Sequence, residues 1–304
     1  MIFSAAGCSP TKKVVDAPSK PAVTDPVKSG ISAVEKAVND YFANMPADVY
    51  KIGEKDFIEK VKAGDKTMLA IDIRTAEDYA KGHVKGAVNI PWGTAISDNL
   101  EKLPTDKTLY VYCYTGQTAG QTVALLNMAG FTTKSVNLGW TLGIAKVEGI
   151  AALTETTPTA FTASSTAKVN ADVKTAITKY YAGLADVNST IYKFYKIGED
   201  DLKKFVDAKD SSIYILSVRK AEDYAIGHIQ GALNIPFGAG MEKKFNTLPK
   251  DKKIVVYCYT GQTAGQVVAG LRMLGYDAVS LNAGMGMASN APAGWANKGF
   301  PVVK

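Results

Sequence analysis

The sequence predicts an α/β protein that contains one domain twice, each copy a parallel sheet with helices on both faces. The first observation is an internal repeat: the eleven residues VYCYTGQTAGQ occur at 111–121 and again at 256–266. The second is that short apolar, β-rich runs alternate with helical segments in each copy, which is typical of parallel sheets covered by helices. The third is length, because 304 residues are enough for two domains with separate cores.

The repeat extends far beyond the shared eleven residues. Tyr50 aligns with Tyr195, and the alignment continues without a gap to Gly139 and Gly284. A period of this length is too large for one solenoid unit, so it indicates a duplicated domain. The expected organisation is a signal remnant and flexible tether at 1–30, a first domain at 31–152, a linker at 153–168 and a second domain at 169–304.

Strands are expected where short apolar runs lack polar alternation, as in strands that are buried on both faces. These runs lie at 68–73, 109–113 and 134–138 in the first copy and at 213–218, 253–258 and 278–282 in the second. Helical segments are expected around 54–63, 76–81 and 117–129.

An amphipathic helix is also expected at the start of each copy. Apolar residues recur there at helical spacing: Val34, Val38, Tyr41 and Phe42 in the first copy, and Val169, Val173, Ile177, Tyr180 and Leu184 in the second. We expect each helix to pack on its own domain, and a partner-binding helix is the alternative.

Composition and charge limit the function classes. Hydrophobic residues make up 46% and charged residues 21%, as in soluble globular proteins rather than disordered ones. No apolar run approaches the roughly 20 residues that span a bilayer. The net charge is +6, but the lysines are scattered. The sequence therefore predicts no nucleic-acid partner.

Cys113 and Cys258 occupy the third position of the repeated eleven residues, at the end of a predicted central strand. A short loop follows each cysteine and leads into a helix. Ligands of open α/β sheets bind at this edge, and a helix N-terminus stabilises an anion there. This setting favours the thiolate and predicts a nucleophile. The alternative, an inert buried cysteine, leaves the identity of the two loops unexplained.

The loop residues are expected to form a cradle for an anion. Glycine relieves the loop of a Cβ atom where the backbone curls, and threonine and glutamine add neutral donors. The candidate substrate-binding residues of the loops are Tyr114, Thr115, Gly116, Gln117 and Thr118 in the first copy, and Tyr259, Thr260, Gly261, Gln262 and Thr263 in the second.

Two motifs resemble the rhodanese family of sulfurtransferases. The segment at 72–91, DIRTAEDYAKGHVKGAVNIP, resembles the rhodanese-homology signature, and CYTGQT followed by a helix resembles the rhodanese active-site loop; the second copy has both motifs, at 217–236 and 258–263. The resemblance covers about 100 residues of each copy. It implies a five-stranded parallel sheet and a ping-pong transfer in which Cys113 and Cys258 carry sulfur as persulfides.

The resemblance also implies the partners. These are a sulfur donor such as thiosulfate, polysulfide or a protein persulfide, and a thiol or cyanide acceptor, with a protein acceptor also open. No metal or organic cofactor is expected, since the two histidines cannot form a metal site with such distant cysteines. Many family loops carry a cationic residue that holds thiosulfate, and YTGQT carries none. Thiosulfate is therefore less favoured as the donor.

Arginine and histidine occur at equivalent positions of the two copies. Arg74 and Arg219 are candidate substrate-binding residues, and an ion pair with a loop acid such as Glu77 or Asp78 is the alternative. His83 and His228 are expected to order a loop rather than to act as a general base. Trp92 and Phe237 are expected in the core or in a pocket wall, and Ser217 replaces Asp72 in the second copy.

Cys8 lies outside the repeat. It ends the segment SAAGC, which resembles the end of a bacterial lipoprotein signal, although the preceding apolar region is short. Lipidation of Cys8 would place a tethered protein in the bacterial cell envelope, on the periplasmic side. If the likeness is chance, the expected location is the cytoplasm.

Two other function classes fit the predicted fold. A related phosphatase or arsenate reductase would need a longer loop with an arginine to grip phosphate oxygens, and neither loop has one. A non-catalytic sulfur-relay or partner-binding module remains the alternative to a sulfurtransferase.

Overall fold

The computed structural model describes residue 1 and residues 31–163 and 167–304. The chain divides into two units, Met1–Ile31 and Ser32–Lys304, and both copies of the repeat lie within the second unit. The predicted tether and Cys8 lie outside the described residues.

The first repeat forms a five-stranded parallel sheet in the order β1-β6-β5-β2-β4. The strands are β1 (Lys51–Ile52), β2 (Met68–Asp72), β4 (Val88–Asn89), β5 (Thr108–Tyr112) and β6 (Thr133–Val136). The sheet is accompanied by α2 (Glu54–Lys62), α3 (Ala76–Ala80), α4 (Thr94–Asp98) and α5 (Gln117–Met128). The central strand β5 is apolar on both faces, which explains why its residues form a buried strand rather than an amphipathic one.

The second repeat has the same topology, in the order β10-β9-β11-β12-β8. Its strands are β8 (Lys196–Ile197), β9 (Ile213–Ser217), β10 (Leu233–Asn234), β11 (Lys253–Tyr257) and β12 (Ala278–Leu281), and its helices are α8 (Glu199–Asp207), α9 (Ala221–Ile226) and α10 (Gln262–Met273). Two five-stranded parallel sheets with helices confirm the predicted fold class. The predicted strands and helices all form, with ends that differ by one or a few residues.

Short elements complete each repeat. Part of the predicted linker forms β7 (Thr154–Glu155), which pairs with β3 (His83–Val84) of the first repeat. The C-terminal segment contacts the second repeat in the same way, through a bridge between His228 and Val303. The other short elements are α7 (Leu184–Val187), the π-helix η2 (Gly139–Gly143) and the 3-10 helices η1 (Leu100–Lys102), η3 (Ile144–Lys146), η4 (Ile150–Leu153), η5 (Lys193–Tyr195), η6 (Met241–Thr247) and η7 (Ala288–Asn290).

The helix at the start of each repeat contacts the other repeat. Helix α1 (Ala33–Ala43) places the ring of Phe42 edge-on to Phe245 of the second repeat, with centroids 5.1 Å apart. Helix α6 (Ala171–Ala182) packs against α4 of the first repeat, and its Lys174 forms an ion pair with Glu101 at 2.6 Å. Each helix also contacts the long helix of its own repeat, α5 or α10. Each of these two helices therefore packs on its own domain, as expected, and on the other domain as well.

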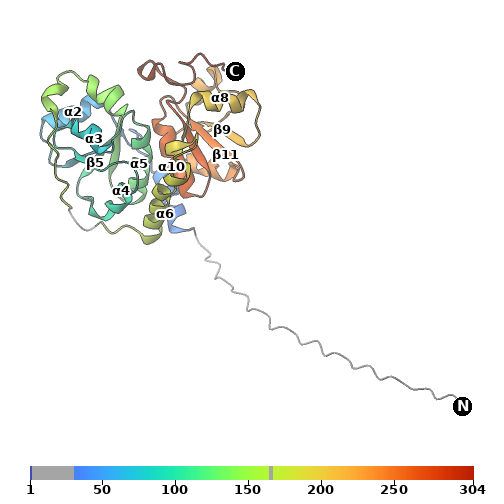
Figure 1. The fold of residues 1–304 in the computed structure, drawn as a ribbon, viewed down its shortest axis with the longest axis horizontal. Helices are drawn as coiled ribbons and strands as arrows, with labels where there is room; N and C mark the ends of the chain where they lie inside the picture. The colour runs from blue at the N-terminus through green and yellow to red at the C-terminus, as the bar shows by residue number, and fades with distance from the viewer. Residues whose placement is uncertain (2–30, 164–166) are drawn as a thin grey trace. The chain divides into compact units, whose positions relative to one another are not determined.

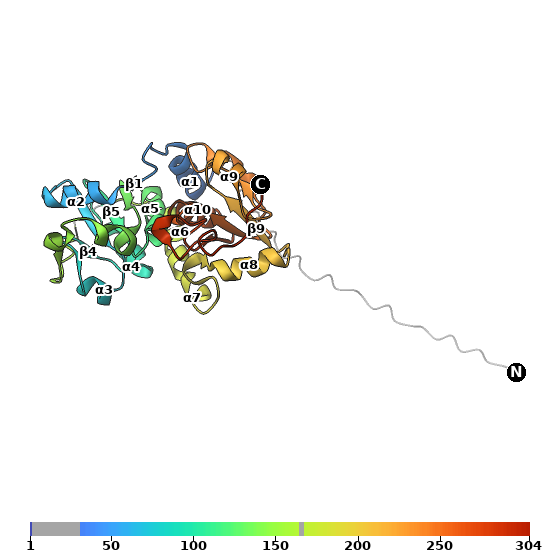
Figure 2. The same ribbon diagram turned by 90° about the horizontal axis from the view of Figure 1, so that it is seen from above.

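Helices α5 and α10 lie side by side at the junction of the two repeats (Figures 1 and 2). They approach closely because each has a glycine at the contact. A Cβ atom on Gly120 would lie 2.2 Å from the carbonyl oxygen of Gln262, and one on Gly265 would lie 2.5 Å from that of Gln117. One apolar cluster consequently runs through both repeats, including Val123 and Val267, and smaller clusters lie on the outer face of each sheet.

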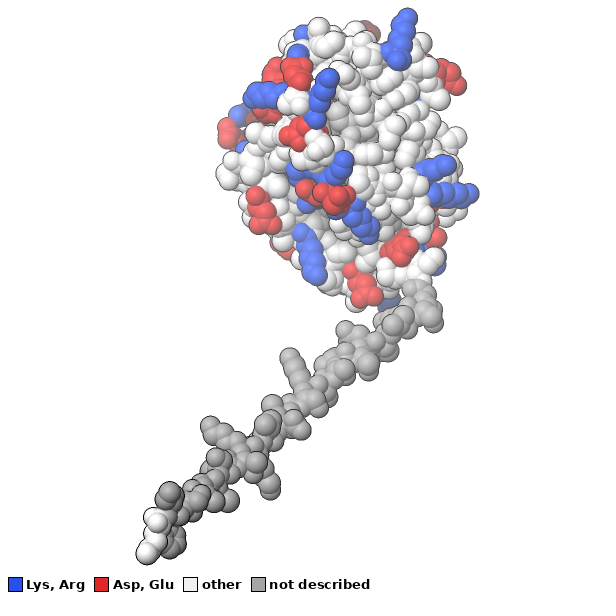
Figure 3. All heavy atoms as spheres, turned by 90° about the vertical axis from the view of Figure 1, so that its right-hand side faces the viewer, with Lys and Arg blue, Asp and Glu red and all other residues white. Residues whose placement is uncertain are grey.

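Charged side chains of both signs are interspersed on the face shown in Figure 3. Within residues 31–163 and 167–304, helices are too short or too polar to cross a bilayer.

Candidate active sites

Cys113 lies directly after the central strand β5 and before α5, at the carboxyl edge of the first sheet. Its side chain turns back toward the helix N-terminus. The sulfur accepts hydrogen bonds from the backbone N–H groups of Gly116, at 3.1 Å, and Ala119, at 3.4 Å. Donors of this kind, together with the helix dipole, stabilise negative charge on sulfur.

Cys258 has the equivalent position between β11 and α10. Its sulfur accepts a hydrogen bond from the N–H of Gly261 at 3.1 Å. Both cysteines are 2% exposed, and neither forms a disulfide. The predicted setting, a cysteine in a loop that leads into a helix, is therefore present twice.

Glycine is required at the helix N-caps of both loops. Gly116 has φ +88° and Gly261 has φ +91°, a region that other residues rarely adopt. The predicted curl of the loop backbone is thus confirmed at both glycines. A side chain there would meet the glutamine of the opposite repeat, since a Cβ atom on Gly261 would lie 2.7 Å from the carboxamide carbon of Gln117.

Sequence reasoning missed a second glycine at each site. Gly139 and Gly284 have φ +59° and lie under the loops. A Cβ atom on Gly139 would be 2.4 Å from the carbonyl oxygen of Cys113, and one on Gly284 would be 2.5 Å from that of Cys258. Just after Gly139, the N–H of Trp140 donates to the Cys113 carbonyl at 2.7 Å. The signal available in the sequence was that the repeat alignment ends on this glycine in both copies.

The tyrosine after each cysteine anchors the loop to a helix. The hydroxyl of Tyr114 donates to Asp78 at 2.6 Å, and this bond is the main reason why the pKa of Asp78 is lowered to about 2. Tyr259 donates to Asp223 in the same way. The tyrosine hydroxyls are therefore engaged at the edge of the site, and the backbone of the loop is what faces the sulfur.

The side chains of Gln117 and Gln262 do not face the sulfur of their own loops. The amide nitrogen of Gln117 donates to the Ser280 hydroxyl at 2.7 Å and to the Leu281 carbonyl at 3.0 Å, both in the second repeat. Gln262 reciprocates with Ser135, at 2.7 Å, and Val136, at 3.3 Å. The expectation that these amides add donors to the cradle is corrected: they join the repeats.

Replacing Gln117 with Ala should therefore lower stability rather than donor affinity. The change leaves the buried Ser280 hydroxyl without its hydrogen-bond donor, which costs about 1–3 kcal/mol of unfolding free energy. The Leu281 carbonyl loses one of its two donors and keeps the N–H of Gly284 at 3.1 Å. Urea denaturation of the variant measures this loss. Thr118→Ala is the control, because that residue is partly exposed and its hydroxyl bonds no described residue. Unchanged stability with a raised KM for the donor would contradict this role.

The equivalent threonines leave their hydroxyls available. Thr115 and Thr118 of the first loop, like Thr260 and Thr263 of the second, are partly exposed, and these hydroxyls make no hydrogen bond within the described parts of the chain. They remain candidates for contacts with a donor.

Arg74 is buried and paired inside its own repeat. It contacts Asp72 at 2.6 Å and the carbonyl of Gly82 at 2.7 Å, and its guanidinium lies 4.4 Å from the ring centre of Trp140. The acid is Asp72 rather than the expected Glu77 or Asp78. The contacts of Arg74 hold loops together, and its substrate-binding role stays a prediction.

Arg219 lacks this acid because Ser217 occupies the equivalent position. Its guanidinium donates to the Gly227 carbonyl and lies 6.0 Å from the ring centre of Tyr259. Its buried Nε atom has no hydrogen-bond partner among the described residues. The first repeat therefore has a buried carboxylate paired with its arginine, and the second repeat has none at the equivalent position.

His83 and His228 order loops, as expected. The Nδ1 atom of His83 lies 2.8 Å from the carbonyl oxygen of Tyr79, and its ring stacks on that tyrosine at 3.6 Å. His228 makes the same contacts with Tyr224, at 3.1 and 3.9 Å.

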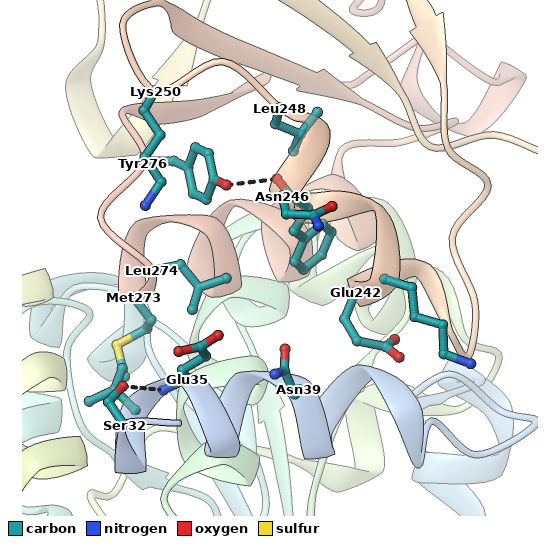
Figure 4. A pocket seen from close by; sticks show the side chains of 13 residues that line it. Ser32, Glu35, Asn39, Glu242, Asn246, Leu248, Lys250, Met273, Leu274 and Tyr276 are labelled. Carbon is teal, nitrogen blue, oxygen red and sulfur yellow. Dashed lines mark hydrogen bonds between the residues drawn. The ribbon is translucent and has the colours of Figure 1, made fainter. Parts of the chain in front are cut away.

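One cavity of the described structure lies away from the cysteine loops. This cavity, shown in Figure 4, lies between α1 and residues of the second repeat, with Glu35, Asn39 and Glu242 on its walls. Over the described ranges, no group of three or more His, Cys, Asp or Glu side chains is placed to hold a metal ion.

Fold and site together define a duplicated α/β protein with a cysteine in an anion-stabilising loop in each copy. The Rhodanese-like domain family matches residues 55–143 and 199–287, which is more than half of the chain. The chain belongs to this family, with two tandem domains.

Several relatives are sulfurtransferases by name. The chain is 34% identical over 84 residues to the putative sulfurtransferase YtwF of Bacillus subtilis, covering 28% of this chain and 80% of that protein. It is 38% identical over 64 residues to thiosulfate sulfurtransferase PspE of Escherichia coli, covering 20% and 61%. It spans less than half of the B. subtilis putative sulfur carrier protein YrkF, 44% of its length.

A rhodanese-related protein from Thermoplasma volcanium is a similar solved structure. It is 29% identical, with a TM-score of 0.30, covering 36% of this chain and 96% of that one.

Proposed function

We propose that this protein is a sulfurtransferase that carries sulfane sulfur as a persulfide on Cys113 and on Cys258. The observation that carries the proposal is the pair of sulfur atoms that accept N–H donors at helix N-termini, at 3.1 Å from Gly116 and from Gly261. A thiolate there is a nucleophile, and the persulfide that follows keeps its negative charge beside the same donors.

The transfer has two balanced steps. The thiolate attacks the outer sulfur of the donor, the S–S bond of the donor breaks, and its electron pair leaves with the remainder, which is sulfite when the donor is thiosulfate. A thiol or cyanide then attacks the outer sulfur of the cysteine persulfide, and the thiolate leaves with the electron pair of that S–S bond. Splitting one transfer into two steps is the advantage of covalent catalysis.

Polysulfide or a protein persulfide is the proposed donor class, with thiosulfate as a weaker one. The reason is that neither YTGQT loop carries a cationic side chain of its own, of the kind that holds thiosulfate in many loops of the family. A thiol, a protein thiol or cyanide is the proposed acceptor.

Both cysteines should accept sulfur, since their loops are identical. Intact-mass spectrometry after polysulfide treatment should find two added sulfur atoms, each about 32 Da, on the Cys8→Ser protein, and one when Cys113→Ser or Cys258→Ser is added to it. The adducts should disappear when cyanide is added, with thiocyanate formed. A Cys258→Ser variant that takes up no sulfur would show that the first site is inert. Sulfur adducts that neither cyanide nor a thiol removes would instead favour the non-catalytic sulfur-relay or partner-binding module.

We also propose that Cys8 carries a lipid that anchors the protein in the bacterial cell envelope. The proposal rests on the segment SAAGC and on the Pro- and Lys-containing stretch that follows it. Cys8→Ser should move the protein from the membrane fraction to the soluble fraction and leave sulfur transfer in vitro unchanged, which immunoblotting of fractions measures. A variant that stays with the membrane would contradict the anchor.

A further inference from the structure

Each active-site loop faces a strand of the opposite repeat. The side chain of Gln117, four residues after Cys113, donates to the hydroxyl of Ser280 on β12. Ser280 is the register partner of Lys196 on the edge strand β8. The edge of the second sheet therefore lies against the loop that holds Cys113.

Strand geometry sets the face on which Lys196 lies. Side chains alternate along a strand, and register partners in a parallel pair lie on the same face. Ile197 is buried in the apolar cluster on the outer face of the second sheet. Lys196 consequently lies on the inner face with Ser280, toward the first repeat.

Contacts of Phe194, two residues before Lys196, bring the same chain segment to the first repeat. Gln121 of α5 donates to the carbonyl of Phe194 at 3.3 Å. The ring of Phe194 packs edge-on against Trp92 of the first repeat, with centroids 5.3 Å apart. Trp92, which the sequence predicted in a core or pocket wall, packs partly buried against the apolar cluster and contacts the chain that leads into β8.

The ammonium of Lys196 has no carboxylate within ion-pair distance in the described parts of the chain, although the side chain is half-buried. Burial lowers the pKa of Lys196, and the nearby Cys113 thiolate and then the Glu199 carboxylate oppose that change. The ammonium of Lys196 and the sulfur of the other repeat therefore lie within electrostatic reach of each other.

The arrangement is reciprocal. Lys51 on β1 is the register partner of Ser135, whose hydroxyl accepts the hydrogen bond of Gln262. Gln266 of α10 donates to the carbonyl of Val49 at 3.3 Å, as Gln121 does to that of Phe194. Lys51 likewise makes no ion pair with a described residue.

We propose that each repeat supplies the cation of the other repeat's site: Lys196 binds the anionic sulfur donor at Cys113, and Lys51 binds it at Cys258. The proposal rests on the proposed function and gives a reason why the YTGQT loops work without a charged residue. It makes the domain junction part of the active sites, so that a single repeat would hold a cysteine and a cradle but no cation.

A crossed design of variants tests this assignment. In a Cys8→Ser background, Cys258→Ser leaves only Cys113 reactive, and Cys113→Ser leaves only Cys258. Lys196→Ala and Lys51→Ala are introduced separately into both backgrounds, so that each lysine change is the matched control of the other. Thermal melting of all four proteins reports whether they fold, and Lys196→Gln and Lys51→Gln replace any Ala variant that does not.

Two disulfide reagents of similar size but different charge distinguish the loss of the lysine charge from a structural change at the cysteine. One is the dicarboxylate 5,5′-dithiobis(2-nitrobenzoate) and the other is neutral 4,4′-dithiodipyridine. The cysteine thiolate attacks either reagent, forms a mixed disulfide and releases an aromatic thiolate or thione that absorbs light. This readout needs no sulfur transfer, so a failed proposal about function would leave it intact.

Lys196→Ala should slow the anionic reagent at Cys113 about tenfold more than the neutral reagent, because only the anionic reagent loses a partly screened charge contact of its own. Lys51→Ala should do the same at Cys258 only. Lys196→Arg and Lys51→Arg should restore the rates, and added salt should shrink the difference. Equal slowing of both reagents, or an effect of each lysine on its own repeat's cysteine, would overturn the proposal.

Discussion

Replacing Gly120 with Ala should destabilise the protein, although this change in a helix interior normally stabilises it by about 1 kcal/mol. The added Cβ atom would lie 2.2 Å from the carbonyl oxygen of Gln262, which belongs to the backbone of α10 and cannot turn away. Helices α5 and α10 must then separate, and overpacking of this kind costs about 1–3 kcal/mol or more. Gly265→Ala should act alike, because its Cβ atom would meet the carbonyl oxygen of Gln117.

Urea denaturation measures this effect as a lowered midpoint. The matched control is Gly238→Ala, since a Cβ atom there meets no atom within 4 Å and its backbone angle is ordinary. A Gly120→Ala protein as stable as the control would mean that the two helices do not approach each other in solution. Separation of the helices should also weaken sulfur loading at both sites, because each site borders the other repeat.

Gly139→Ala should reduce sulfur loading of Cys113 about 100-fold, the scale on which a displacement of about 1 Å slows a positioned reaction. A Cβ atom at this position would lie 2.4 Å from the carbonyl oxygen of Cys113 and 2.8 Å from the amide nitrogen of Gly116. The same amide donates to the sulfur. The loop must therefore shift as a whole, which moves its backbone N–H donors out of hydrogen-bonding geometry with the sulfur. Gly284→Ala should affect Cys258 in the same way.

Rates of persulfide formation are best followed by mass spectrometry in proteins with one cysteine, which carry Cys8→Ser together with Cys258→Ser for Gly139 or with Cys113→Ser for Gly284. Gly149→Ala controls for backbone strain, because Gly149 has φ +76° but a Cβ atom there meets nothing within 4 Å. If Gly139→Ala loaded sulfur as fast as Gly149→Ala, the position of the loop backbone would not govern the reaction, and the cradle would lie in the side chains.

Local patterns were enough to predict the framework of each repeat. Apolar runs such as 109–113 form strands that are buried on both faces, and this can be predicted without knowing which residues cover them. The position of Cys113 between β5 and α5 follows from the chain itself, since strand, loop and helix are consecutive. For the same reason the left-handed conformation of Gly116 could be predicted from the loop alone.

The partners of the loop side chains could not be predicted in this way. Gln117 stands beside the cysteine in sequence, which suggested a donor to the anion, but its amide bonds Ser280, more than a hundred residues later. Polarity shows that a residue needs hydrogen-bond partners and does not show where they are. The pairing of Arg74 with Asp72, rather than with Glu77 or Asp78, likewise depended on which of three nearby acids was buried.

By itself, therefore, the sequence determined two α/β domains and a cysteine at the strand end of each, because these features depend on contacts between neighbours in the chain. The tertiary structure was needed to show that α1 and α6 each contact the other repeat, that α5 and α10 meet at Gly120 and Gly265, and that Gln117 beside the Cys113 loop bonds β12. The physical reason is the duplication itself. When two copies present the same apolar faces, periodicity identifies the face that is buried, and only the closest packing of the whole chain selects the copy that buries it.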